Sequence, residues 1–219
     1  MERKLEPCIS LDLETSGLDT ETDTVFQVGM VLETGDLSTA PEDLPCVNFV
    51  VKPVAPITGN PYALWLNNNL LGIIAGTIRE DNPDYELVDA KDLLHLILST
   101  LVSWRNYLDK DLGLSFPDGK PQILSKNGEK MDIPMLNNFA YSAQVGHEWG
   151  KVSQNWFRDL ISHRSLDVGS IWAPILGRNA SLKEINKLTG RPEVTHDALI
   201  DAIDNVYALR EAFKRAYSF

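Results

Sequence analysis

The sequence predicts an α/β fold in which a mixed sheet is flanked by helices on both faces. Two observations lead to this prediction. Short apolar, β-branched segments come first along the chain, and segments with helical periodicity then alternate with further short strands. No repeat, low-complexity tract or linker divides the sequence, and 219 residues suffice to bury one substantial core. We therefore expect residues 1–219 to form a single domain.

Five segments are predicted to form strands. The first alternates apolar with polar residues and runs into a turn at Thr15-Ser16-Gly17, and the others are short apolar runs. In chain order the predicted strands are Ile9–Glu14, Val25–Leu32, Cys46–Val51, Gln122–Ser125 and Ser165–Val168. The first three follow one another without an intervening helical segment, which predicts a meander.

The remaining apolar residues recur at helical spacing. The predicted helices are Pro61–Ala75, Leu87–Asp109, one opening near Asp132, Val168–Leu176, Leu182–Leu188 and Asp197–Ala216. A Gly/Pro-rich loop, Leu112–Pro121, precedes the fourth strand. Four tryptophans are expected to pack in the core: Trp104, Trp149, Trp156 and Trp172.

Charge and composition exclude several classes of protein. With 20 basic and 31 acidic residues the formal net charge is −11, which argues against a protein that coats long nucleic acid by electrostatics alone. It does not argue against one that meets a phosphate chain through metal ions at one place. The N-terminus is charged and no apolar run approaches the ~18 residues of a membrane span, so we expect a cytoplasmic protein without a membrane partner. Cys8 and Cys46 lie far apart without metal-binding spacing, and both are expected as thiols in the core.

The first candidate functional motif is Asp12-Leu13-Glu14, the one Asp-x-Glu tripeptide that lies within an alternating strand. Period two places both carboxylates on one face, with Ile9, Leu11 and Leu13 on the other. Two like charges on a half-buried strand are unfavourable unless a cation lies between them. The alternative is a strand whose polar face is simply hydrated, and the motif alone does not choose between the two.

A second acidic motif, His196-Asp197-Ala198-Leu199-Ile200-Asp201, opens the last predicted helix. The apolar stripe of this helix consists of Ala198, Ala202, Val206, Leu209, Phe213 and Ala216. Asp201 falls at the edge of the stripe, where a carboxylate can reach a site at the strand ends. His196 is off the same helical face and is expected in the loop before the helix. The alternative is that Asp197 favours the positive end of the helix dipole and Asp201 is hydrated.

Between these motifs, Asp132 lies where a loop after a strand meets a helix. With Pro134 behind it, Asp132 suits an N-cap position. Capping and metal binding can coexist, because a cap uses only one carboxylate oxygen.

The order and setting of these motifs resemble the DnaQ-like, or DEDDh, family of 3′-5′ exonucleases, whose fold is ribonuclease H-like. The run from Asp12 through Thr15 and Gly17 to Leu18 is similar to the first motif of the family, and the run from His196 to Ala202 is similar to the third. The second motif departs from the family pattern, because Met131 stands where an aromatic or other large residue usually precedes the aspartate. Asp132 is the candidate there, and Asp167 is the fallback. The resemblance covers Ile9 to about Leu209 and implies a ribonuclease H-like mixed five-stranded sheet.

The resemblance also implies a site for two divalent cations, Mg²⁺ or Mn²⁺. Asp12 would bridge both ions, Glu14 and Asp201 would hold the water-activating ion, and Asp132 would support the second. His196 would be the general base. The residue types agree independently, because four carboxylates without cysteine form a hard oxygen site. An imidazole with an ordinary pKa of ~6.5 is largely neutral at pH 7 and can accept a proton.

Substrate contacts are expected on either side of the carboxylates. In the family, the positions of Thr15 and Gly17 typically contact the terminal nucleotide, and Leu18 is expected against its base. Trp65 or Tyr62 is predicted to stack on a base, the alternative being that both pack in the core. A chain of this charge also needs basic residues near the metals, and the candidates are Lys126, Lys130, Arg158 and Arg164.

These inferences predict a metal-dependent 3′-5′ exonuclease that releases nucleoside 5′-monophosphates from the 3′ ends of single-stranded DNA or RNA. One alternative is an oligoribonuclease-like enzyme restricted to short RNA. Another is a catalytically silent, nuclease-like module that binds nucleic-acid ends or a polymerase, and a third is that the acids form only a hydrated face. Homodimers are common in the family, which makes a second copy of the chain a candidate partner.

Overall fold

Six strands form one mixed sheet in the computed structural model, which describes residues 4–81, 83–144, 153 and 155–217. The strands are β1 (Cys8–Thr15), β2 (Val25–Glu33), β3 (Cys46–Lys52), β4 (Glu86–Asp89), β5 (Ile123–Ser125) and β6 (Leu166–Asp167). Their order is β4-β3-β2-β1-β5-β6. β1, β2 and β3 are antiparallel neighbours, as the predicted meander requires, and β4, β5 and β6 each pair in parallel. The predicted mixed sheet in an α/β fold is confirmed, but the predicted number of strands is one too small.

The missed strand, β4, occupies the start of the predicted helix Leu87–Asp109. Only Val88 of its four residues is buried, so the segment carries too little alternation to be recognised. The helix begins instead at Ala90.

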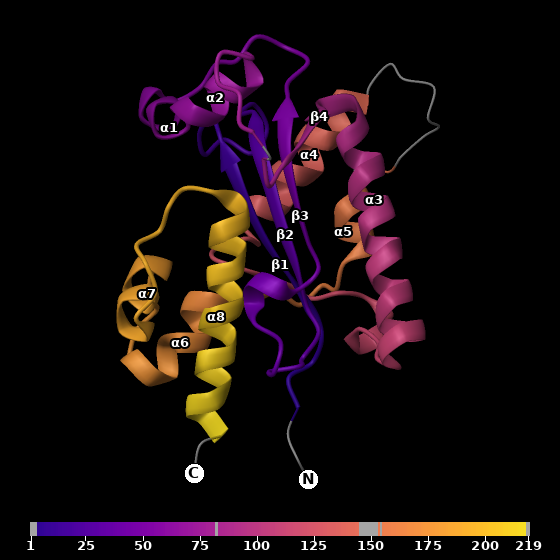
Figure 1. The fold of residues 1–219 in the computed structure, drawn as a ribbon, viewed down its shortest axis with the longest axis vertical. Coiled ribbons are helices and arrows are strands. Elements are labelled where there is room, and N and C mark those ends of the chain that lie inside the picture. The colour runs from indigo at the N-terminus through magenta and orange to yellow at the C-terminus, as the bar shows by residue number, and fades with distance from the viewer. Residues whose placement is uncertain (1–3, 82, 145–152, 154, 218–219) are drawn as a thin grey trace.

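Helices cover both faces of the sheet, as predicted (Figure 1). They are α1 (Pro61–Leu66), α2 (Asn68–Ile74), α3 (Ala90–Tyr107), α4 (Asp132–Gln144), α5 (Trp156–Leu160), α6 (Val168–Leu176), α7 (Leu182–Thr189) and α8 (Ala198–Tyr217). Two differences from the prediction concern the shorter helices. The predicted helix Pro61–Ala75 is two helices, which meet at Asn67, and α5 was not predicted.

β1 separates two hydrophobic clusters. Ile9, Leu11 and Leu13 pack in the cluster that contains α3 and α4, whereas Cys8 packs in the cluster that contains α6, α7 and α8. On the second face, the Ser10 hydroxyl donates to the Ala202 carbonyl of α8 at 2.7 Å. β1 is therefore a central strand covered on both faces, and not an edge strand with one hydrated face.

The predictions for the core are largely confirmed. Trp104, Trp156 and Trp172 are buried, and Trp149 lies outside the described residues. Cys8 is buried, but Cys46 is exposed at the first residue of β3, so its prediction as a core thiol was wrong. No helix of the described part of the chain has the length and apolar character needed to cross a bilayer.

A buried ion pair joins the end of β2 to the middle of α8. The Arg210 guanidinium donates to both carboxylate oxygens of Glu33, at 2.5 and 3.0 Å. It also donates to the carbonyls of Thr39 and Asp36, at 2.5 and 3.1 Å. The Glu33 side chain is fully buried, so the Arg210 guanidinium compensates for the loss of hydration of its carboxylate.

Replacing Arg210 by methionine would leave the Glu33 carboxylate buried without its cation. We expect Arg210→Met to lower the free energy of unfolding by about 3–5 kcal/mol. Arg215→Met is the matched control on the same helix, because Arg215 pairs with Glu211 at the surface and also lies over Trp172; the expected loss is below about 1 kcal/mol. Urea unfolding measures both, and equal losses would contradict the assignment.

Candidate active site

The candidate site lies where the carboxyl end of β1 meets the beginning of α8, beneath α1 and α2 (Figure 1). One oxygen each of Asp12, Glu14 and Asp201 lies within 4.8 Å of the others. Glu14 and Asp201 are 8% and 5% exposed, and Asp12 is partly buried. Burial of this extent excludes the interpretation of these acids as a hydrated face. Asp201, predicted at the edge of the apolar stripe of this helix, is buried and lies close enough to β1 to join Asp12 and Glu14.

Asp132 approaches the same group from the start of α4. After burial itself, its charge contributes most to the raised pKa of Asp12, ahead of Asp201 and Glu14. Asp132 is the first residue of the helix and not the residue before it, so the N-cap interpretation is not supported. Its Oδ2 atom is buried and accepts no hydrogen bond. The four predicted carboxylates therefore converge from three separate elements.

The fallback residue, Asp167, has a structural role. Its Oδ1 atom accepts hydrogen bonds from the backbone N–H and hydroxyl of Ser170, both at 2.8 Å, which caps α6. Its Oδ2 atom accepts from the Asn127 N–H at 2.9 Å. Both oxygens are thus directed to the neighbouring turn.

The carboxylates of the site favour their protonated forms in the absence of a cation. Burial raises the pKa of Asp132, Asp201 and Glu14 to about 7 each, and the charge of Asp201 adds to the effect at Glu14. Burial and the charge of Asp132 raise the pKa of Asp12 well above its ordinary value. Bound cations would reverse this preference, because they stabilise the charged forms.

The donor set fits divalent cations of the hard type. The Oδ1 atom of Asp201 and the Oδ2 atom of Asp132 are both buried acceptors without a hydrogen-bond donor. A buried acceptor left unpaired destabilises the fold, and a coordinated cation satisfies it. Asp12, Glu14, Asp132 and Asp201 are therefore the residues that could hold Mg²⁺ or Mn²⁺.

The beginning of α8 is held directly against β2. Asp197 caps the helix, because its Oδ1 atom accepts from the N–H groups of Leu199 and Ile200 at 3.0 and 3.1 Å. The Gln27 side chain of β2 donates to Asp197 Oδ2 at 3.2 Å and accepts from the Ala198 N–H at 3.1 Å. This network fixes the first turn of the helix that carries Asp201, and the sequence analysis did not identify Gln27.

Gly29 permits this close approach. A Cβ atom at Gly29 would lie only 2.2 Å from the carbonyl carbon and oxygen of Ala198. Any side chain at this position would push the first turn of α8 away from the sheet, and Asp201 with it.

His196 lies in the loop before α8, as predicted. The residue has a φ of 56° and its side chain is exposed. It lines the same cavity as Asp12, Glu14 and Asp201. The imidazole is thus accessible to solvent at the cavity that the three carboxylates also line.

The cavity above the carboxylates, which we call the main cavity, has a volume of about 440 Å³. Three carboxylates, Asp12, Glu14 and Asp201, line it together with His196. The other lining residues are Leu13, Thr15, Gly17, Leu18, Asn60, Tyr62, Ala63, Leu66, Asn67, Lys126, Leu182 and Val194. The predicted substrate residues Thr15, Gly17 and Leu18 are therefore brought together beside the acids. Trp65 is not among the lining residues.

Two of these residues shape the turn after β1. The Thr15 hydroxyl donates to the Gly17 carbonyl at 2.7 Å, which closes the turn. A Cβ atom at Gly17 would lie 2.3 Å from the Asp23 carboxylate, so a side chain at this position would displace Asp23 from its contacts with Ser16 and Asp19. Leu18 follows with 80% of its surface exposed.

Asn67, at the junction of α1 and α2, is a site residue that the sequence analysis missed. Its side-chain amide donates to the carbonyls of Thr15 and Ala63, at 3.2 and 3.1 Å. A hydrogen bond between the Asn67 side chain and Glu14 also lowers the pKa of Glu14, against the effect of burial. Asn67 is 3% exposed, so it connects the two short helices rigidly to the end of β1.

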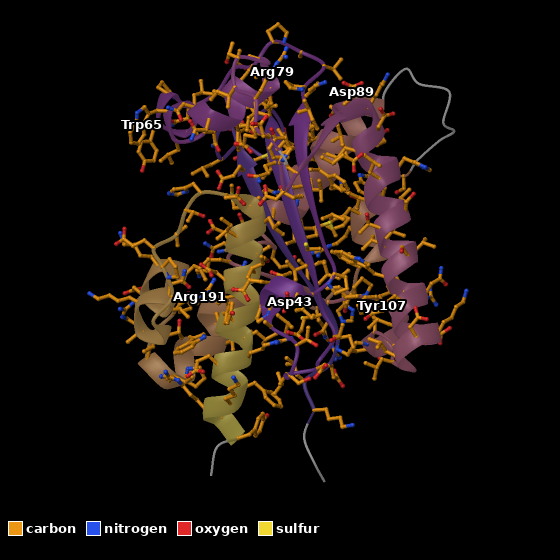
Figure 2. All side chains as sticks on the ribbon, in the orientation of Figure 1. Asp43, Trp65, Arg79, Asp89, Tyr107 and Arg191 are labelled. Atoms are coloured by element: carbon orange, nitrogen blue, oxygen red, sulfur yellow. The ribbon has the colours of Figure 1, made fainter. Side chains whose placement is uncertain are left out.

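The aromatic residues of α1 are not core residues. Tyr62 and Trp65 are each 66% exposed, with ring centroids 6.0 Å apart and ring planes at 30°. Figure 2 shows Trp65 projecting from α1 away from the sheet. The interpretation that both pack in the core is therefore wrong.

Of the four basic residues predicted near the site, Lys126 alone lines the main cavity among the described residues. Arg158 forms a bidentate pair with Glu129, at 3.0 and 2.5 Å, and Arg164 is exposed elsewhere. Lys130 lines a neighbouring cavity.

Comparison with family models finds no match for the sequence, and neither does comparison with curated proteins. Solved structures do match the fold. The structure of Escherichia coli exonuclease I in complex with a dA16 oligonucleotide has a TM-score of 0.62 at 15% identity, over 98% of this chain and 42% of that one. The structure of exonuclease I without ligand has a TM-score of 0.60 at 15% identity, over 97% of this chain and 42% of that one. Cell-death related nuclease 4 (CRN-4) has a TM-score of 0.53 at 14% identity, over 97% of this chain and 65% of that one.

The chain thus spans about two fifths of the length of the exonuclease I structures it matches. At this level of identity the likeness concerns the fold, and it agrees with the predicted ribonuclease H-like α/β architecture.

The raised pKa of Asp201 makes the stability of the metal-free protein depend on pH. Because the pKa rises from 3.8 to about 7 on folding, the folded state binds more protons between these values, and stability falls as pH rises through this window. We expect Asp201→Asn to have the same free energy of unfolding as the wild type near pH 4. At pH 8 in EDTA its free energy of unfolding should be higher than that of the wild type by on the order of 1–3 kcal/mol.

Asp19→Asn is the control for this measurement. Asp19 is exposed, and hydrogen bonding from the Glu21 N–H lowers its pKa. Replacing Asp19 should therefore lower the free energy of unfolding at neutral pH. Urea unfolding across the pH range measures both differences. A gain for Asp201→Asn that does not grow with pH would contradict the burial of a charge at this position.

Proposed function

We propose that this chain is a metal-dependent 3′-5′ exonuclease that hydrolyses phosphodiester bonds at the 3′ end of single-stranded DNA or RNA and releases nucleoside 5′-monophosphates. One observation carries the proposal: four carboxylates from β1, α4 and α8 converge, three of them line an open cavity, and Asp132 and Asp201 each keep a buried oxygen that accepts no hydrogen bond within the described part of the chain. A fold without a cation ligand has no reason to retain this arrangement, because it raises the free energy of the folded chain.

Two divalent cations, Mg²⁺ or Mn²⁺, fit this donor set. Asp12 belongs to the group of three with Glu14 and Asp201 and is also near enough to Asp132 for that charge to raise its pKa, which suits a ligand shared by two ions. When bound, the cations would supply charge neutralisation at the scissile phosphate and a lowered pKa for a water molecule.

His196 is the proposed acceptor of the proton from the attacking water. It lines the main cavity beside Glu14 and Asp201, and its exposed imidazole is free to turn toward the water. The carboxylates are poorly placed for this role, because they would be occupied as ligands.

The comparisons support a nuclease. The exonuclease I structures include complexes with single-stranded oligonucleotides, and CRN-4 is described as a nuclease. These matches span 97–98% of the present chain, so the elements that carry the carboxylates lie within the matched region.

A gel time course tests the reaction. With Mg²⁺ or Mn²⁺, the protein should shorten 5′-labelled single-stranded DNA or RNA of identical sequence in one-nucleotide steps, and EDTA should abolish the ladder. Asp12→Ala and His196→Ala should each reduce the rate at least 100-fold, which is at the low end of the range for a general base. The sugar that is degraded faster identifies the substrate class. Absence of a ladder with folded protein under either metal would disprove the catalytic proposal.

The apolar rim of the main cavity is the proposed platform for the terminal base. Leu18 and Tyr62 both line the cavity and are 80% and 66% exposed, so neither is required to hold the core together. Exposed apolar side chains at a cavity mouth are typical of a binding surface. Trp65 lies beside Tyr62 and outside the cavity. It would contact a base only beyond the terminal nucleotide, or would act indirectly by supporting the Tyr62 ring.

Substitution separates these two aromatic roles. Stacking on a base contributes about 1–3 kcal/mol, so we expect Tyr62→Ala to raise KM for an oligonucleotide by about 10-fold, with kcat little changed. Trp65→Ala should have a smaller effect. Steady-state kinetics on dT8 measure both, and Val102→Ala, at an exposed position of α3, is the control. A larger effect at Trp65 than at Tyr62 would contradict the placement of the base.

A further inference from the structure

Lys126 stands between the main cavity and a second one. The residue follows β5 directly and lines the main cavity with Asp12, Glu14 and Asp201. The second cavity, of about 220 Å³, is lined by Ser125, Asn127, Gly128, Glu129, Lys130, Ser165, Asp167, Ser170 and Asn179. Because β1, β5 and β6 are parallel, their carboxyl ends share one edge of the sheet, and both cavities open along that edge.

The second cavity adjoins the carboxylate site. Its lining residue Gly128 lies against Asp132: a Cβ atom at Gly128 would be 3.2 Å from Asp132 Oδ2. A nucleic-acid strand whose scissile phosphate lies at the carboxylates therefore has a neighbouring cavity on the side of Asp132.

The ammonium group of Lys126 is held in position by side chains that line the second cavity. It donates to the Oδ1 atoms of Asn179 and Asn127, at 2.9 and 3.4 Å. Gly169 leaves room for it, since a Cβ atom there would lie 2.5 Å from the Lys126 Nζ. The Lys126 side chain is only 19% exposed, so its position is set by contacts within the protein, unlike that of a hydrated surface lysine.

One N–H of Lys126 remains for a ligand. An ammonium group has three donors, and two are directed to amide oxygens. The Asp167 carboxylate is 3.6 Å from Nζ, beyond hydrogen-bond distance, and its oxygens already accept from Asn127 and Ser170. The Asp167 charge offsets part of the Lys126 charge without using this donor.

We propose that Lys126 and the second cavity form a subsite for the penultimate nucleotide, in which Lys126 binds the phosphate on the 5′ side of that nucleotide. This inference rests on the proposed function, because it takes the scissile phosphate to lie at the carboxylates. The lining of the second cavity is polar, from Ser125 and Asn127 to Asn179, and offers no flat apolar surface for a base. Recognition at this subsite is therefore independent of base identity.

A pair of dinucleotides isolates this contact. Thymidylyl-thymidine without a 5′ phosphate (TpT) and with one (pTpT) present the same scissile bond and differ only in the phosphate assigned to Lys126. We expect the wild type with Mg²⁺ to hydrolyse pTpT with a kcat/KM about 10-fold above that for TpT, as a charge-assisted hydrogen bond provides. Lys126→Met should bring this ratio close to one, because kcat/KM for pTpT should fall by more than kcat/KM for TpT. Lys91→Ala, at an exposed lysine at the start of α3, should keep the wild-type ratio.

Binding gives a second readout that does not depend on turnover. Fluorescence anisotropy of labelled dT8 with Ca²⁺ in place of Mg²⁺, over a range of KCl concentrations, should show a smaller salt dependence for Lys126→Met, by about 0.7 in the slope of log Kd against log salt.

The outcomes distinguish the two proposals. Equal losses on TpT and pTpT, or an unchanged ratio together with an unchanged salt slope, would overturn the subsite. If the wild type hydrolyses neither dinucleotide nor longer strands, the proposed function fails, and the salt slope alone then decides whether Lys126 binds phosphate.

Discussion

The site depends on one packing constraint, the contact of the first turn of α8 with β2 at Gly29. The backbone of Ala198 lies where a Cβ atom of residue 29 would be, so the helix begins as close to the sheet as two backbones allow. Gln27, two residues earlier on the same face of β2, bonds both to the cap residue Asp197 and to the Ala198 N–H. Asp201 lies one turn further along α8, and its position relative to β1 follows from these contacts. The Glu33–Arg210 pair fixes the same helix against the same strand lower down.

The consequence of this close packing is an electrostatic conflict. Asp12 and Glu14 occupy a central strand that is covered by the helix bearing Asp201, so their charges repel in a medium that hydrates them poorly. The metal-free chain relieves the conflict by protonation, which is why burial raises the pKa values of these carboxyls. Bound cations would relieve the same repulsion while the carboxylates stay charged. Stability and cation affinity are therefore linked at this site, since the same repulsion that destabilises the apo fold is removed when a cation binds.

The sequence predicted the elements that carry strong local signals, and it did not predict the contacts that connect them. The alternation around Asp12 and the helical stripe from Ala198 each extend over several residues, so β1, α8 and the acids that they carry were recognised. The strand β4 was not predicted, because its single buried residue, Val88, leaves no alternation to detect. The partners of Gln27 and Arg210 lie 171 and 177 residues away in the sequence, and no local pattern reports such contacts. Asn67 interrupts a continuous helical pattern because its side chain bonds back to Thr15, which is again a long-range contact.

The acidity of the whole chain constrains how a phosphate chain is held. With a net charge of −11, the protein repels a polyanion at a distance, and Lys126 is the one lysine or arginine among the described residues that line the main cavity. Under the proposed function, attraction would therefore arise within a few ångströms, from cations at the carboxylates, from stacking on the exposed rim at Leu18 and Tyr62, and from the positioned ammonium of Lys126. Because each of these contacts would lie within about two nucleotides of the scissile bond, an enzyme of the proposed function would recognise the end of a strand through these residues and bind the rest of the strand weakly.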